Sequence, residues 1–445
     1  AGDIDARNIV AAGVGTFISD ITVNSVIIGK GANSVATNTA LGVNALDANT
    51  TGDNNVAVGA NASTELTTGT KNISVGSGAL QLTTTAHNNV AIGDDALQDN
   101  VTGSDNTAVG RRALTDNTAS SNSAFGADAL KANTTGQYNT ALGAYALESN
   151  VTGQNNTAVG YVALRDNTGS HNTAVGEEAL KVNTTGASNV AVGRNALRAN
   201  TTASHNTAIG DNALLVNVTG ADNTAVGAAC LDANTGNYNT GVGKASLTAN
   251  TTGQQNAAFG LSSMITNTTG DFNTAIGTNA LYSNATTSNN TAVGRAALFA
   301  NIAAYNTAVG DLALYANTTG ASNTAVGRNS LATNTTGTQN TAVGAETLDA
   351  GNHTNCNAFG YQALSANSTG ASNCAFGSHA LMLNTTGGNN VAIGHRALDA
   401  NTTASSNTAV GAQALGANTT GTENSSVGAF ALTSNTTANN NTSVG

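Results

Sequence analysis

Residues 139–155 read NTALGAYALESNVTGQN, and residues 156–171 repeat the same pattern as NTAVGYVALRDNTGSH. From about residue 38 to residue 445 the chain is built from such units, with the consensus Asn-Thr-Ala-Val-Gly-x-x-Ala-Leu-x-x-Asn-Thr-Thr-Gly-x-x. The glycine after Val, here called the anchor glycine, recurs 25 times from Gly42 to Gly445, and positions in each unit are numbered relative to it. A fixed period of this kind indicates a repeat architecture.

The length of the unit predicts a solenoid. Nineteen of the 24 intervals between anchor glycines are 17 residues long and five are 16. A helix-pair repeat needs more than about 30 residues, and the dense Asn, Thr and Gly disfavour helix. We therefore predict an all-β fold, a parallel β-solenoid (β-roll) of about 24 coils of 16–17 residues, each with two short strands and two turns. The shortened units lose a residue in the Asn-Thr-Thr-Gly segment, which predicts a surface turn there.

The repeat also sets the expected domain boundaries. Residues 1–37 are predicted to form an N-terminal β segment and a leading coil, and residues 38–445 the solenoid rod. The chain begins at Ala1 rather than Met and ends on an anchor glycine, so we expect a processed product or a fragment.

Three positions of the unit predict the interior. Position −1 is always apolar, and position +4 is Leu except at Ser63 and Met264. Stacked side chains of this kind contribute roughly 1.5–3 kcal/mol each when buried, so both rows are expected inside. Position −4 is Asn in 24 of 25 units, the exception being Cys356. Such a row predicts a ladder of stacked amides, and the alternative interpretation is a series of repeated ligand-binding sites.

Position −2 is always Ala, Ser or Gly. Neighbours along a strand alternate between its faces, so these side chains are expected to point away from the row at position −1. No Lys, Glu or Gln occurs there, as if the strand were buried on both faces. This predicts association with further copies of the chain as a parallel homotrimer. The alternative is a very flat monomer in which the small side chains pack inward.

Composition limits the partners and the location. The net charge is −11 and no basic patch is present, which argues against nucleic-acid binding. No apolar run approaches the roughly 20 residues of a membrane span, so no membrane insertion is expected. Three cysteines, Cys230, Cys356 and Cys374, are too few for a disulfide framework and are interpreted as small buried side chains.

The sequence predicts no enzyme. Nothing interrupts the repeat in a way that would create a catalytic site. The histidines lie at variable turn or corner positions without the spacing of metal ligands: His87, His171, His205, His353, His379 and His395. The carboxylates after Leu are single residues in distant coils: Asp47, Asp232, Asp349 and Asp399. We therefore predict no catalytic, cofactor-binding or metal site and no cofactor.

Two protein families resemble this chain. Residues 24–29, Asn-Ser-Val-Ile-Ile-Gly, and the Asn-Thr-Ala-Val-Gly-x-x-Ala-Leu units resemble the head repeats of trimeric autotransporter adhesins. Those repeats form a left-handed parallel β-roll, three rolls to a head. The longer unit and the leading segment, residues 2–23, are similar to phage tail-fibre-like proteins, which often carry a self-cleaving C-terminal chaperone domain. The resemblance implies a left-handed solenoid, a trimer, and a location outside the cell or on the virion surface.

These observations favour a structural fibre or appendage protein, with a mechanical spacer or attachment role. The first alternative is a bacterial surface adhesin head that binds a cell-surface receptor, a glycan or matrix along the rod. The second is an ice-binding solenoid with a regular row of Thr at position −3. Against ice binding, Val56, Ile73, Val90 and Val190 interrupt this row, and we expect it to point inward.

Overall fold

The computed structural model describes residues 20–445. Its contacts divide the chain into two units, Ala1–Thr185 and Gly186–Gly445, and each is described by itself. Most of the leading segment expected from the sequence, residues 2–19, lies outside the described residues.

The first unit contains a short antiparallel entry followed by parallel strands. Strand β1 pairs with β2, and β2 pairs with β3, both antiparallel, and a 3-10 turn, η2 (Ala32–Ser34), joins β2 to β3. From β3 onward each strand pairs in parallel with the next. The strands are β1 (Ile21–Val23), β2 (Val26–Gly29), β3 (Thr39–Gly42), β4 (Val56–Val58), β5 (Ile73–Val75), β6 (Val90–Ile92), β7 (Thr107–Val109), β8 (Ser123–Phe125), β9 (Thr140–Leu142), β10 (Thr157–Val159) and β11 (Thr173–Val175).

The second unit is wholly parallel in its strand pairing. Each strand from β12 to β26 pairs with its successor. The strands are β12 (Val190–Val192), β13 (Thr207–Ile209), β14 (Thr224–Val226), β15 (Thr240–Val242), β16 (Ala257–Phe259), β17 (Thr274–Ile276), β18 (Thr291–Val293), β19 (Thr307–Val309), β20 (Thr324–Val326), β21 (Thr341–Val343), β22 (Asn357–Phe359), β23 (Cys374–Phe376), β24 (Val391–Ile393), β25 (Thr408–Val410), β26 (Ser425–Val427) and β27 (Thr442–Val444).

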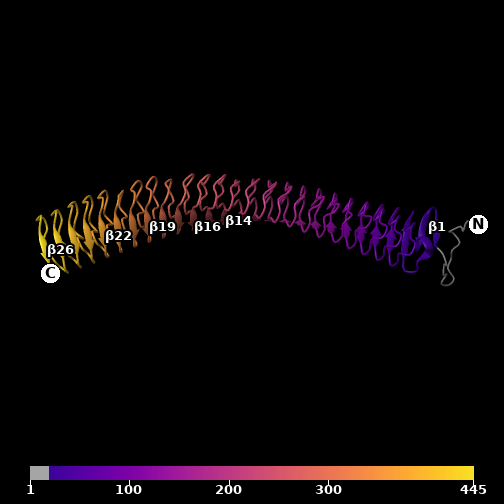
Figure 1. The fold of residues 1–445 in the computed structure, drawn as a ribbon, viewed down its shortest axis with the longest axis horizontal. Coiled ribbons are helices and arrows are strands. Elements are labelled where there is room, and N and C mark those ends of the chain that lie inside the picture. The colour runs from indigo at the N-terminus through magenta and orange to yellow at the C-terminus, as the bar shows by residue number, and fades with distance from the viewer. Residues whose placement is uncertain (1–19) are drawn as a thin grey trace, which may run out of the picture. The chain divides into compact units, whose positions relative to one another are not determined.

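The register pairs each position with the same position of the next coil. Ala208 lies opposite Ala225, and Thr207 lies opposite Thr224. The register continues unchanged through the shortened coils, where Ala158 lies opposite Ala174. Figure 1 shows the resulting stack of coils within each unit. The prediction of an all-β parallel solenoid of about 24 turns is thus confirmed, with no α-helix among residues 20–445.

Each coil contains one strand, where the sequence predicted two. The wall opposite the strand, positions +2 to +6, does form hydrogen bonds from coil to coil, such as Leu197 N–H to Ala213 O at 3.0 Å. Its backbone is not extended, because position +2 and the Leu at position +4 have positive φ in nearly every coil, 52° at Leu197. Ala196 and Leu197 are consecutive and both fully buried, which a strand with alternating side chains forbids.

The left-handed backbone conformation of the Leu at position +4 allows its side chain to pack in the interior. A non-glycine residue in this conformation costs roughly 1–2 kcal/mol, whereas burying a Leu side chain contributes roughly 1.5–3 kcal/mol. The free energy gained by burying the Leu side chain exceeds the cost of the left-handed conformation, and the hydrogen bonds between coils stabilise the wall further. The result is a wall in which two adjacent side chains, Ala and Leu, both enter the interior.

The structure reverses the predicted faces of the strand. Position −2 points inward and is fully buried, as at Ala208 and Ala225, whereas positions −3 and −1 point outward. The exposed fraction at position −1 reaches 40% at Phe125 and 50% at Leu142. The expectation that the row at position −1 forms the interior was therefore wrong, while the Leu row at position +4 is interior as predicted. The small side chains pack inward, as the flat-monomer alternative required.

The interior is too thin for two large rows. A β-carbon added at Gly241, position −2 of its coil, would lie 2.5 Å from Cys230 Sγ and 3.4 Å from Leu231 Cδ1 of the preceding coil. The row at position −2 thus packs directly on the Ala and Leu of the opposite wall. Leu on one side leaves room only for Ala, Ser or Gly on the other. This contact explains why position −2 never varies beyond small residues.

Stacking also explains the anchor glycine. At Gly210 φ is 139°, and a β-carbon would lie 2.5 Å from the carbonyl oxygen of Gly227 in the next coil. Both the backbone conformation and the space between coils therefore require glycine.

Cys230 and Gly241 form a complementary pair that can be tested. We expect Gly241→Ala to lower the free energy of unfolding by about 1–3 kcal/mol, because the new methyl group overpacks against the Cys230 sulfur. Combining it with Cys230→Ala should restore stability to within about 1 kcal/mol, since other coils carry Ala at both positions, as at Ala213 and Ala225. Thermal melts and hydrogen exchange of β15 measure the effect. A double variant as unstable as Gly241→Ala alone would contradict the packing described.

Candidate interaction surface

The Asn row at position −4 forms the predicted amide ladder. Asn156 donates its side-chain N–H to Asn139 Oδ1 of the preceding coil at 3.1 Å, and its backbone N–H to the same oxygen at 3.0 Å. Its own Oδ1 accepts the backbone N–H of Asn172 at 2.9 Å. These residues are at most 1% exposed. The ladder is therefore internal, and the alternative of repeated ligand-binding sites on this row is excluded by its burial.

A second Asn ladder, at position +7, was not recognised from the sequence. Asn150 donates to Asn133 Oδ1 of the preceding coil at 2.9 Å and to the carbonyl oxygen of Gly153 at 3.0 Å. The same Gly153 oxygen accepts a bond from Asn139 at 2.8 Å. The two ladders thus hold the Asn-Thr-Thr-Gly turn from inside. The consensus carries Asn regularly at position +7, which could have predicted this ladder, but the residue was interpreted only as part of the Asn-Thr-Thr-Gly turn.

Removing one amide tests how much the ladders contribute. Asn156→Ala leaves the buried backbone N–H of Asn172 without its bond and removes one of the two side-chain bonds to the carbonyl oxygen of Gly169, which keeps the bond from Asn167. Unpaired buried groups cost about 1–3 kcal/mol each, so we expect a loss of about 3 kcal/mol and faster hydrogen exchange in the coils around β10. The control, Gln154→Ala, removes an exposed amide two residues before Asn156 and should change stability by less than about 0.5 kcal/mol. Equal effects of the two substitutions would contradict a structural role for the ladder.

One coil, between Gly344 and Gly360, departs from both ladders. It carries Cys356 at position −4 and Gly351 at position +7. The carboxamide oxygen of Asn334 in the preceding coil consequently has no hydrogen-bond partner. His353 occupies a turn position, as the sequence indicated, but its side chain fills the interior and is fully buried. The burial of His353 depends jointly on the 16-residue length of this coil and on the two replacements, so no single position predicts it.

The hydrogen bonds of His353 define its protonation state. Its Nε2 lies 3.2 Å from the carbonyl oxygen of Leu348, which can only accept, so Nε2 carries the proton. Its Nδ1 lies 3.0 Å from the side-chain nitrogen of Asn367, which donates, so Nδ1 is the acceptor. The ring is therefore neutral. Burial lowers the pKa of His353 from 6.5 to about 4.

This pKa predicts a local dependence of stability on pH. Between about pH 6.5 and pH 4 the unfolded chain binds a proton at His353 that the folded chain does not. Stability is thus complete above pH 6.5 and falls as the pH is lowered, by a total of about 3 kcal/mol. We expect hydrogen exchange of the coil from Gly344 to Gly360 to accelerate over this range, and His353→Gln to remove that dependence. The exposed His171→Gln is the control, and a pH dependence unchanged by His353→Gln would contradict the assignment.

The other candidate residues remain apart. Among residues 20–445 no group of three or more His, Cys, Asp or Glu side chains could hold a metal ion. Asp232, Asp349 and Asp399 lie in separate coils, and partial burial raises the pKa of each. The cysteines are free, Cys230 and Cys356 being buried as expected, whereas Cys374 at position −3 is partly exposed. Burial raises the pKa of the Cys230 thiol to about 12, so it is protonated and unreactive at neutral pH.

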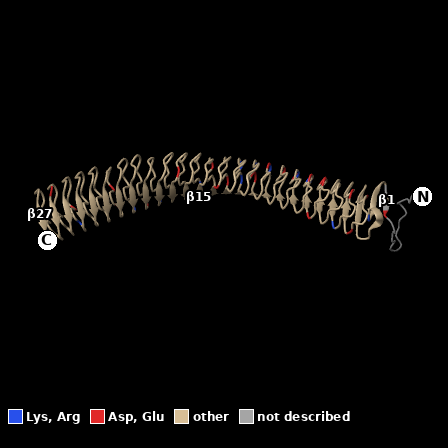
Figure 2. Ribbon diagram, in the orientation of Figure 1, with Lys and Arg blue, Asp and Glu red and all other residues tan. Residues whose placement is uncertain are grey.

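Charged side chains are confined to the turns and corners. Ion pairs there join successive coils, such as Arg194 Nε to Asp211 Oδ1 at 2.9 Å and Arg112 Nε to Asp128 Oδ1 at 2.8 Å. Figure 2 shows Lys, Arg, Asp and Glu on the loops while the strands are free of them. None of the strands from β1 to β27 contains a charged residue.

The outward side of the strands is therefore the main candidate for an interaction. This sheet face consists of positions −3 and −1 of each coil, Thr and Val in the consensus. Position −1 is Val, Ile, Leu or Phe in all 25 cases although it is partly exposed, and Phe359 and Phe376 stack there with ring centroids 4.4 Å apart. Apolar surface of this extent is unusual on a protein that works alone in water. The Thr row at position −3 lies on this outward face. The expectation that it points inward, which was one of two arguments against ice binding, was therefore wrong.

Comparison with known proteins does not assign this chain to a family. The chain matches no known family model and no curated protein. Among residues 20–445 no helix combines the length and the apolar character needed to cross a bilayer.

Proposed function

We propose that this chain is a structural fibre protein of the phage tail-fibre-like type, found outside the cell or on the virion surface, with a spacer or attachment role and no catalysis. The proposal rests on the absence of charged residues from the sheet face. Positions −3 and −1 provide 50 outward places in 25 coils, and no charged residue occupies any of them. A solvated face tolerates Lys and Glu, so their absence indicates that the face is covered in the assembled protein.

The partner that fits such a face is another copy of the chain. The face repeats with the coil spacing, and only a surface with the same repeat can match it along many coils. Position −2, whose small residues predicted association, is internal, but positions −3 and −1 are outward and also lack charged residues. The resemblance to trimeric adhesin heads favours three parallel, left-handed copies. The adhesin alternative shares this assembly and differs in binding host or matrix along the rod.

Mass in solution tests the assembly. We expect a species of about three times the chain mass of 43.7 kDa at micromolar concentration. The variant Val226→Lys/Val242→Lys/Phe259→Lys places three charges on the sheet faces of β14, β15 and β16 without entering the interior. Its association should be at least tenfold weaker by analytical ultracentrifugation, because burying unpaired charges is costly.

The matched control is Thr252→Lys/Thr269→Lys/Thr286→Lys, which adds the same charge at exposed turns. It should leave the mass unchanged. A monomeric wild-type chain would overturn the proposal that the sheet faces associate. If that monomer showed thermal hysteresis, the ice-binding alternative would replace it.

A further inference from the structure

Three consecutive coils carry an aromatic side chain at position +5: Tyr282, Phe299 and Tyr315. No other coil has an aromatic residue at this position; Ile265 precedes the group and Ala332 follows it. In a sequence with only 4% aromatic residues, this is a local departure from the repeat. The row lies on the wall opposite the sheet face, so it is independent of the proposed association.

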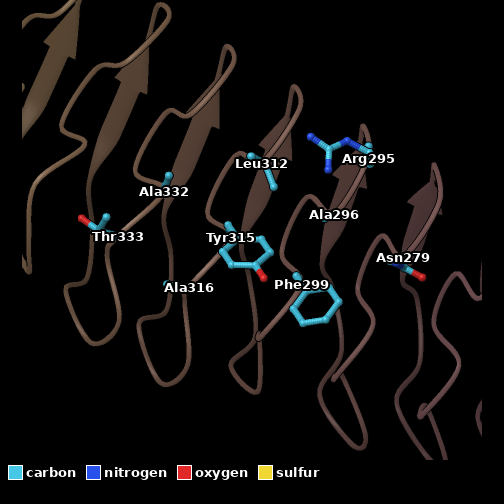
Figure 3. Close-up of a pocket in the computed structure, with 9 residues that line it drawn as sticks. All are labelled: Asn279, Arg295, Ala296, Phe299, Leu312, Tyr315, Ala316, Ala332 and Thr333. Atoms are coloured by element: carbon cyan, nitrogen blue, oxygen red, sulfur yellow. The ribbon is translucent and has the colours of Figure 1, made fainter.

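The three rings form an extended platform. The centroids of Tyr282 and Phe299 are 4.9 Å apart with an angle of 16° between planes, and those of Phe299 and Tyr315 are 5.2 Å apart at 17°. Figure 3 shows the rings of Phe299 and Tyr315 side by side with their faces toward the viewer. Tyr315 is 40% exposed. A row of near-parallel, solvent-accessible rings is thus presented along the direction in which the coils stack.

The platform borders a shallow hollow of about 750 Å³. The hollow arises where the small Ala332 follows Tyr315 at position +5. Its rim is polar: Asn279 contributes an amide, and Arg295 forms an ion pair with Asp311, Nε to Oδ1 at 2.9 Å. An apolar floor with a few polar groups at its edge is the usual composition of a small-molecule site.

We propose that this platform binds a neutral, extended β-linked polysaccharide. The C–H groups on the face of a pyranose ring carry slight positive charge and pack on the negative face of an aromatic ring. Successive sugar rings in an extended β-linked chain are spaced similarly to these aromatic centroids. Arg295 uses Nε and Nη2 to bond Asp311, which leaves three of its five N–H donors, together with the second lone pairs of the Asp311 oxygens, for sugar hydroxyls.

Charge selects against other ligands of similar shape. Arg295 is neutralised by Asp311, and the chain carries a net charge of −11, so the site does not attract uronic acids, phosphorylated sugars or nucleotides. The proposal goes beyond the structural role argued above and holds for a monomer or an oligomer.

Isothermal titration of the full chain with cellohexaose tests the proposal, with an anionic oligouronate of equal length as the comparison. We expect saturable binding of cellohexaose and at least tenfold weaker binding of the oligouronate. Tyr315→Ala should weaken cellohexaose binding at least tenfold. Tyr305→Ala is the matched control, because this tyrosine lies in a neighbouring coil at a different corner and is 65% exposed; it should leave binding unchanged.

Circular dichroism and ultracentrifugation accompany each variant. Phe299→Ala, at a less exposed ring, should also weaken binding, and Tyr315→Ala remains the decisive variant if Phe299→Ala does not fold. Failure of the wild-type chain to bind cellohexaose at millimolar concentration would overturn the proposal, as would equal losses in Tyr305→Ala and Tyr315→Ala. A change of oligomeric mass in Tyr315→Ala without a change in binding would make the platform a contact between copies instead.

Discussion

Each coil depends on lying in register with the next, and the anchor glycine is a point of close backbone contact in that stack. There the backbones approach so closely that no β-carbon fits between successive carbonyl groups. This spacing allows the amides at positions −4 and +7 to bond from coil to coil, and it stacks Leu on Leu and Ala on Ala. A single coil buries almost nothing alone, so stability is a property of neighbouring pairs.

The interior shows how polar groups can replace a conventional core. Much of the buried volume is Asn, whose amides would be costly to bury unpaired. The two ladders avoid this cost because the amides bond to Asn at the same position of the adjacent coil and to carbonyl oxygens of the turn. Where the repeat is broken, the partner is lost: Asn49 and Asn334 have unbonded oxygens because Leu66 and Gly351 stand in the following coils. A substitution in one coil can therefore remove the hydrogen-bond partner of a buried amide in the adjacent coil.

The sequence predicted the solenoid, its parallel stacking and the amide ladder because these follow directly from the period. It did not reveal which face of the strand is internal. The apolar row that includes Val192 and Ile209 predicts a core, but the Leu of the opposite wall leaves room only for Ala191 and Ala208. The left-handed Leu197 was also unexpected, since its conformation follows from two adjacent inward side chains and not from its own propensity. The aromatic platform was overlooked because each ring occupies a position that varies freely elsewhere.

The pairing of like positions has a consequence for length. Where neighbouring coils carry Asn in both ladders and Ala at positions −2 and +3, removing or duplicating a whole unit creates a junction like those already present. In such runs the protein can be lengthened or shortened in steps of one coil, about 4.8 Å each, with the same register and the same amide bonds. The length of such a chain is set by the number of its units, and recombination between units that share the consensus is enough to change it.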